Sequence, residues 1–245
     1  MRSIPAFALA VFALCVPHLF AQAPPDRPRF ETDKTLIDDT GDRGPQTGQK
    51  AVKLFNGKDL SNWTWHTLDE QAPIENTWSV EDGLLVCKGR PNGYLRTKDD
   101  YENYRLTLEW RWPEGSQPGN NGVLIHTTTP RELGVWPKSL EVQLAHQNAG
   151  DFWVIGTTIK VPDAERRVMG RRHLNLTDDS EKPPGEWNKM EIVARGATVT
   201  VRVNGELVNE ASQVSQTKGA ICLQSEGAAA HFRNIVLTPL DKDKP

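Results

Sequence analysis

The sequence is poor in cysteine and lacks the short motifs of several common enzyme classes. Only three of its 245 residues are cysteine, and it contains no Cys-x-x-Cys, no His-Glu-x-x-His and no Gly-x-Ser-x-Gly. These patterns would indicate a redox or zinc site, a zinc protease and a serine hydrolase. Cys87 and Cys222 lie in apolar, strand-like runs. There they either form a disulfide or act as small buried hydrophobic residues.

The sequence also lacks an excess of either charge. It has 29 Lys and Arg against 32 Asp and Glu, which gives a net charge of −3. Nothing in that balance indicates binding to nucleic acid or to an anionic membrane. Beyond the N-terminal region, no stretch is long and apolar enough to cross a bilayer. We therefore expect no nucleic-acid partner, and no membrane association once the N-terminal segment has been removed.

The N-terminal region has the order of a secretory signal peptide. Arg2 precedes a nearly uncharged apolar run that ends in small residues, and this predicts a signal peptide over residues 1–23. A membrane anchor is the alternative, but prolines interrupt the run. Residues 24–50 are rich in Pro, Asp, Thr and Gly, which predicts a disordered linker. The folded part is therefore expected to be exported, to the periplasm or the extracellular space.

The remaining chain, residues 51–240, reads as one all-β domain. Apolar and polar residues alternate over 103–112 and again over 139–146, and no segment has a long helical period. Asn204-Gly205 between two apolar runs is a strong signal of a β-hairpin. Short strands separated by frequent turns predict a sandwich or a barrel. A curved two-sheet sandwich would leave one polar concave face, where we expect the functional site.

Two polar pairs stand on strands that otherwise face a core. Glu109 and Arg111 form the first pair, and Glu141 and Gln143 form the second. Residues i and i+2 of a strand point to the same face, so we predict that all four share the concave face. The alternative is that both pairs lie on solvated outer faces.

Other residues near these strands suit the binding of a sugar. The sequence has eight tryptophans, and aromatic faces combined with a few polar groups are typical of saccharide sites. A glycosidase of the usual type needs two carboxyl groups. Gln143 cannot titrate, so Glu109 or Asp151 would have to supply the second one. Asp178 and Asp179 lie next to each other in a predicted loop. They either bind Ca²⁺ or are simply exposed to solvent.

Several segments in order resemble the 3-keto-disaccharide hydrolase family, formerly a domain of unknown function. The resemblance covers most of residues 51–240 and is carried by 54–63 (LFNGKDLSNW), 78–83 (WSVEDG), 120–123 (NNGV), 141–143 (EVQ), 185–188 (GEWN), 204–205 (NG), 223–227 (LQSEG) and 232–235 (FRNI). The resemblance implies a concanavalin A-like jelly-roll β-sandwich of two antiparallel sheets. It also implies action on glycosides that are oxidised to a ketone at sugar carbon 3.

Chemistry on such a substrate needs fewer acids. A ketone at carbon 3 acidifies the hydrogen on carbon 2, one base can remove it, and the enolate then expels the group on carbon 1. Hydration of the enone gives the free keto-sugar. Glu141 or His126 is the candidate base, and Arg111 or a divalent metal is the candidate stabiliser of the enolate. The candidate substrate-binding residues are Glu109, Asn121, Gln143, His146, Asp151, Trp153 and Gln224.

Two other functions remain open for this sequence. One is a non-catalytic, lectin-like carbohydrate-binding domain, because a fold does not fix a function. The other is an endoglucanase that uses two carboxylates. An enzyme that cleaves 3-keto-glycosides should place Glu141 with His126 or Arg111 around one cleft. A lectin should show aromatic rings and amides without a convergent base.

Overall fold

The computed structural model describes residues 50–177 and 180–241. The predicted signal peptide, the predicted linker except for its last residue, and the Asp178-Asp179 pair lie outside the described residues. Within the described parts of the chain, no helix is long and apolar enough to cross a membrane. The helical elements are the single turns η1 (Ile74–Asn76) and α1 (Ala164–Arg167).

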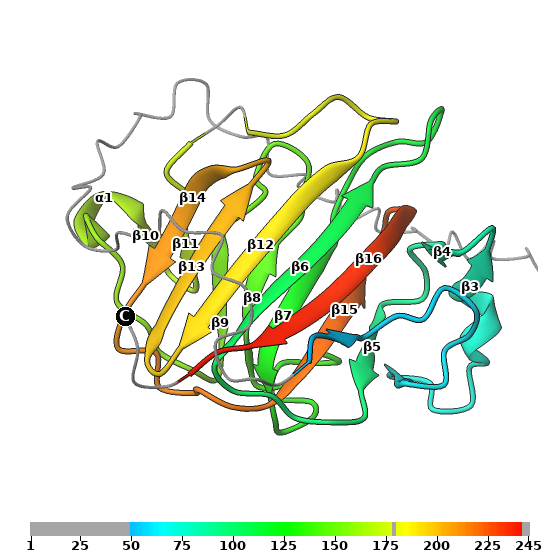
Figure 1. Cartoon of the computed structure of the whole chain (residues 1–245), viewed down its shortest axis with the longest axis horizontal. Coiled ribbons are helices and arrows are strands. Elements are labelled where there is room, and N and C mark those ends of the chain that lie inside the picture. The colour runs from blue at the N-terminus through cyan, green and yellow to red at the C-terminus, as the bar shows by residue number, and fades with distance from the viewer. Residues whose placement is uncertain (1–49, 178–179, 242–245) are drawn as a thin grey trace, which may run out of the picture.

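Two antiparallel sheets pack face to face, as the sequence predicts (Figure 1). We call them the front and back sheets after their places in this view. The front sheet has the order β14 (Glu206–Ala211), β13 (Thr198–Val203), β12 (Asn188–Arg195), β6 (Tyr104–Arg111), β16 (Ala230–Pro239), β4 (Leu84–Cys87) and β3 (Trp78–Glu81), with β1 (Val52–Lys53) paired to β16. The back sheet has the order β10 (Val168–Met169), β11 (Arg172–His173), β9 (Phe152–Ile155), β8 (Ser139–Gln143), β7 (Gly122–Thr127), β15 (Ala220–Ser225), β5 (Gly93–Thr97) and β2 (Trp63–Thr67).

The core between the sheets is built by the alternation seen in the sequence. On β6, Leu106, Leu108 and Trp110 are at most 1% exposed, and on β8 Leu140 and Val142 are fully buried. Because successive side chains of a strand point to opposite faces, the polar residues between them face outward from their own sheet. Cys87 and Cys222 are both free and buried, so they are small buried residues rather than a disulfide.

A second, smaller apolar cluster lies on the outer face of the back sheet. It consists of Tyr94, Leu124, Ile155 and Cys222, and the partly buried Trp136 packs against it. Trp136 belongs to the connection at 128–138 between β7 and β8, which therefore folds back over this face. The cluster covers part of the outer face, and the polar residues of β8 occupy another part.

Candidate active site on the outer face of the back sheet

Glu141, Gln143 and Gln224 meet around a glycine of the central strand. Gly122 pairs with Gln143 across the β7–β8 ladder. A Cβ atom on Gly122 would lie 2.4 Å from Oε1 of Gln224 and 2.8 Å from Oε1 of Glu141. Both side chains therefore lie over the glycine, in space that any larger residue would fill. The i, i+2 spacing correctly placed Glu141 and Gln143 on one face, and they form the floor of the site.

The amide groups of this floor are buried and incompletely paired. Gln143 is 6% exposed and Gln224 is 1% exposed. Oε1 of each has no hydrogen-bond partner among the described residues. An unpaired buried polar atom costs about 1–3 kcal/mol, so the two oxygens favour a ligand that carries hydroxyl donors.

A second carboxyl group, which the sequence analysis did not expect, lies near enough to shift the pKa of Glu141. Burial raises the pKa of Glu141 well above its ordinary value, and the nearby Glu226 raises it further. Burial also raises the pKa of Glu226, to about 7. Glu226 follows β15, and it is two residues beyond Gln224 in the sequence. The i, i+2 spacing from Gln224 could have marked it as a candidate.

A cation and an aromatic ring form the wall beside the carboxyl pair. Trp153 on β9 lies directly opposite Glu141 in the ladder. The guanidinium carbon of Arg171 is 5.4 Å from the centre of the Trp153 ring. The positive charge of Arg171 opposes the rise in pKa of both Glu141 and Glu226. Arg171, which sequence reasoning missed, is thus the cation that acts on the two acids.

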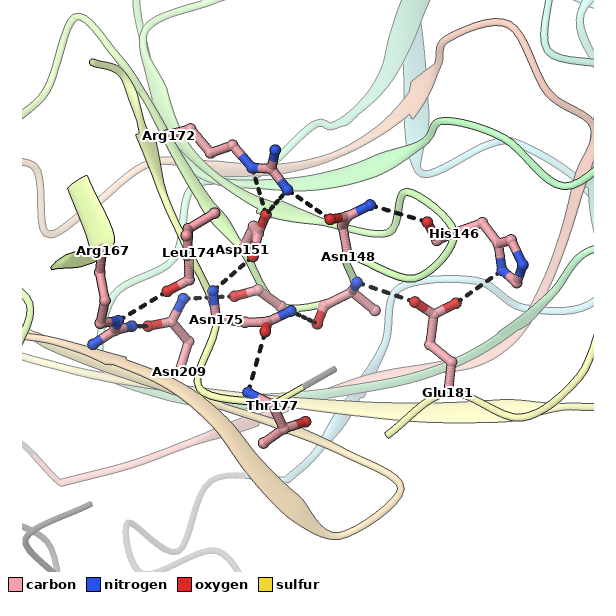
Figure 2. A network of polar contacts seen from close by, with 12 residues as sticks. His146, Asn148, Asp151, Arg167, Arg172, Leu174, Asn175, Thr177, Glu181 and Asn209 are labelled. Carbon is pink, nitrogen blue, oxygen red and sulfur yellow. Dashed lines mark hydrogen bonds and ion pairs between the residues drawn. The ribbon is translucent and has the colours of Figure 1, made fainter. Parts of the chain in front are cut away.

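Asp151 connects the segments next to that wall by hydrogen bonds to Arg172 and Asn175 (Figure 2). It is fully buried, and its Oδ2 accepts a hydrogen bond of 2.6 Å from Nε of Arg172. Its Oδ1 accepts one of 2.6 Å from the backbone N–H of Asn175. Arg172 lies opposite Trp153 in the β9–β11 ladder and also donates to Asn148. Both oxygens of Asp151 are therefore used by the protein, so its assignment to substrate binding is corrected to a structural anchor.

A second buried acid holds the turn that follows β8. Oε2 of Glu181 lies 3.5 Å from Nδ1 of His146, and Oε1 accepts a hydrogen bond from the backbone N–H of Ala149 (Figure 2). Burial raises the pKa of Glu181 to about 7, although the backbone N–H groups of this turn oppose the rise. Burial lowers the pKa of His146. The pair is therefore expected to hold a proton on Glu181 rather than on the imidazole at neutral pH.

The replacement Glu181→Gln should make the stability of the fold less dependent on pH. The folded pKa of about 7 lies above the ordinary 4.5. The folded state therefore binds this proton more tightly, and the free energy of unfolding falls as the pH rises from about 4.5 to about 7. A shift of this size corresponds to up to about 3 kcal/mol. Urea unfolding at pH 5 and pH 8 should show a smaller loss in the variant than in the parent protein. An equal loss in both would contradict the buried, protonated state of Glu181.

Glu109 and Arg111 lie on the outer face of the other sheet, so the prediction that they share a face with Glu141 is wrong. Glu109 is bound to Arg233 of β16 at 2.6 Å. The guanidinium carbon of Arg111 lies 4.7 Å from the ring of Trp187. Alternation fixes the face of one strand, but it does not say which of the two sheets the strand joins. Neither residue reaches the carboxyl pair.

His126 and Asn121 lie inside the protein rather than at the site. His126 has a φ of 52° beside the point where the β7–β15 pairing shifts register. Its fully buried ring meets Tyr104 of the front sheet edge-on, with 5.7 Å between the ring centroids. Asn121 is also fully buried, and its amide lies 3.9 Å from Sγ of Cys87. Simple alternation predicted His126 on the outer face, and the irregular register turns it inward.

The described residues contain no group of three or more His, Cys, Asp or Glu side chains that could hold a metal ion. Carboxylate and amide oxygens are ligands that a hard divalent cation accepts, so the divalent metal allowed by the sequence stays a prediction.

Comparison with known proteins identifies the family. Residues 50–238 match the 3-keto-alpha-glucoside-1,2-lyase-like domain. The chain belongs to this family. A 3-keto-disaccharide hydrolase of Bacteroides thetaiotaomicron is 25% identical over 80% of this chain and 81% of its own length. The family resemblance inferred from the sequence is thereby confirmed.

Solved structures of other proteins share the fold of this chain. A candidate glycosyl hydrolase from Parabacteroides distasonis superimposes with a TM-score of 0.57 at 25% identity, over 78% of this chain and all of that chain. A β-glucanase of Bacillus licheniformis superimposes with a TM-score of 0.51 at 13% identity, over 79% of this chain and all of that chain. The glucanase shares only the fold at this identity. Together they confirm the concanavalin A-like jelly-roll sandwich.

Proposed function

We propose that this protein is a carbohydrate-active enzyme that cleaves 3-keto-glycosides by elimination and hydration, with net hydrolysis. The observation that carries the proposal is the buried carboxyl group of Glu141 over Gly122, beside two unpartnered amide oxygens and near enough to Glu226 and Arg171 for both charges to shift its pKa. The described activity of the Bacteroides thetaiotaomicron relative supports it. A lectin-like domain would need the aromatic wall and the amides, but not two acids with raised pKa values.

The two acids divide the proton transfers of the elimination. Interacting carboxyl groups titrate as a pair, and the singly protonated pair holds one base and one acid. Glu141 takes the hydrogen of carbon 2, the electrons form the enolate, and the bond from carbon 1 to the leaving oxygen breaks. Glu226 gives its proton to that oxygen. The charge of Arg171 stabilises the enolate.

Hydration completes the reaction. Water adds its oxygen to carbon 1 of the enone, and a proton returns to carbon 2, which gives the free 3-keto sugar. The oxygens of Gln143 and Gln224 accept hydrogen bonds from sugar hydroxyls, and Trp153 packs against the ring.

Direct hydrolysis by two carboxylates is the second candidate, because Glu226 supplies the second acid that the sequence analysis did not find. An isotope experiment separates the two functions. The protein is incubated in D₂O with a 3-keto-disaccharide and with the unoxidised disaccharide. We expect cleavage of the first only, with one deuterium on carbon 2 of the released keto-sugar beyond that in an enzyme-free control. Cleavage of the unoxidised sugar without deuterium on carbon 2 would establish the endoglucanase reading.

We also propose that the protein acts after export, in the periplasm or outside the cell. The proposal rests on the signal-peptide pattern of residues 1–23. N-terminal sequencing of the mature protein should find its first residue after that segment, and an intact Met1 would contradict export by this route.

A further inference from the structure

A cavity lies on the same face of the back sheet, away from the carboxyl pair. Its volume is about 250 Å³, the room of about eight water molecules at roughly 30 Å³ each. This is enough for one hexose ring and too little for a large ligand. The side chains that matter for its chemistry are those of Trp65, His66, Glu70, Tyr94, Arg131 and Val135.

The register of the sheet places this cavity in line with the candidate active site. Tyr94 on β5 lies directly opposite Gln224, and His66 on β2 lies directly opposite Tyr94. Gln224 and Glu141 meet over Gly122 of β7. At roughly 4.8 Å per strand, the step from β7 to β5 is about 10 Å, and β2 is about 5 Å further. The cavity is thus beyond the reach of a sugar ring joined directly to the cleaved bond, but within reach of the next ring.

The walls of the cavity suit an uncharged sugar. The rings of His66 and Tyr94 are stacked, with centroids 5.0 Å apart and planes 8° apart. Burial lowers the pKa of His66, and the charges of Arg96 and Arg131 lower it further, which favours the neutral ring. Flat aromatic rings of this kind are what a sugar ring packs against.

The connection 128–138 forms the outer wall of the cavity. Nη2 of Arg131 donates to Glu70 at 2.6 Å, which ties this connection to the segment after β2. Val135 is 8% exposed and lines the cavity from the same connection. The single positive charge at the rim is therefore balanced by a carboxylate, which disfavours an anionic ligand.

We propose that this cavity is a distal sugar subsite, which binds the second ring beyond the cleaved bond. The proposal rests on the proposed function, because it places that bond at Glu141. It follows that the preferred substrate has at least three sugar units, with the oxidised ring at one end. A disaccharide would leave the cavity empty and gain nothing from it.

Steady-state kinetics with matched substrates tests this subsite. Cellobiose and cellotriose, each oxidised at carbon 3 of the non-reducing ring, are compared on the parent, on His66→Ala and on the control His231→Ala. His231 is a half-buried histidine of the front sheet. We expect a lower KM for the trisaccharide in the parent. His66→Ala should raise that KM about tenfold, the size of one aromatic contact of about 1.4 kcal/mol, and leave the disaccharide unchanged.

A binding measurement makes the subsite independent of the reaction. Saturation-transfer NMR with unoxidised cellotriose should show contact in the parent and in His231→Ala, and a weakened signal in His66→Ala. If the sugar binds in this way but nothing is cleaved, the proposed function fails and the subsite stands. If the oxidised sugars are cleaved with equal KM values and His66→Ala changes neither kinetics nor binding, the subsite is refuted.

Discussion

The replacement Glu141→Gln is expected to reduce kcat on a 3-keto-glycoside by about 10³-fold, within the 10²- to 10⁴-fold range of general-base catalysis. Gln keeps the size and shape of the side chain over Gly122, so the fold and the binding of the sugar should survive. It removes the carboxylate to which the proton of carbon 2 is assigned. The comparison is made on purified, folded protein with the release of 3-keto sugar as the readout.

The matched control is Glu191→Gln. Glu191 is a half-buried glutamate in the middle of β12, on the other sheet. The same chemical change there should leave kcat within a factor of two of the parent value. A folded Glu141→Gln protein with the parent rate would eliminate Glu141 as the base.

The pH dependence of kcat/KM tests the assignment of Glu141 as the base in a second way. Burial and the neighbouring Glu226 raise the pKa of Glu141, and burial raises the pKa of Glu226 to about 7. The elimination needs one carboxylate and one carboxylic acid, so the parent's kcat/KM should pass through a maximum and fall on both sides of it. A profile that keeps rising with pH and shows no maximum would exclude Glu226 as the acid.

The replacement Asp151→Ala is expected to cause the largest loss of stability, about 3 kcal/mol. Breaking a buried ion pair by removing one partner costs about 3–5 kcal/mol, because the other charge is left uncompensated. Arg172 keeps 17% of its side-chain surface exposed, which places the estimate at the lower end of that range. The backbone N–H of Asn175 loses its acceptor as well. For a domain of this size the melting temperature should fall by about 6–12 °C.

An exposed ion pair of similar length provides the control. Arg96 and Asp100 are 2.8 Å apart, with 24% and 44% of their side-chain surfaces exposed. Asp100→Ala should cost less than about 1 kcal/mol, since surface pairs contribute little. Thermal unfolding followed by circular dichroism measures both variants. If Asp151→Ala melts within 2 °C of the parent, the Asp151 network is not the support of the Trp153 wall.

The sequence was sufficient for the fold and for one strand of the site. Alternation around Leu140 and Val142 placed Glu141 and Gln143 together, because a side-chain period of two follows from strand geometry alone. It misplaced Glu109 and Arg111, since strand pairing between distant segments has no local signal. It misplaced His126 as well, because the change of register near Ala220 interrupts the period.

The missed residues show what local pattern leaves out. Arg171 stands in the β10–β11 turn, and its charge acts on acids that are 30 or more positions away in the chain, which only the folded structure reveals. Glu226 lies just beyond the end of β15, where the alternation of the strand no longer fixes the direction of its side chain. Pairing between distant segments thus determines which residues belong to the site. Local alternation determines only the face of a strand on which each side chain lies.

Gly122 has a further consequence for anyone who redesigns this enzyme. Its missing side chain is the space in which the Glu141 and Gln224 oxygens lie. Positions 122, 141 and 224 come from three separate segments of the chain, yet they share one small volume and can be varied only together. A mutant library that randomises position 122 alone would return inactive proteins almost throughout. A library that holds glycine there and varies position 224 can change how the sugar is held while the base stays in place.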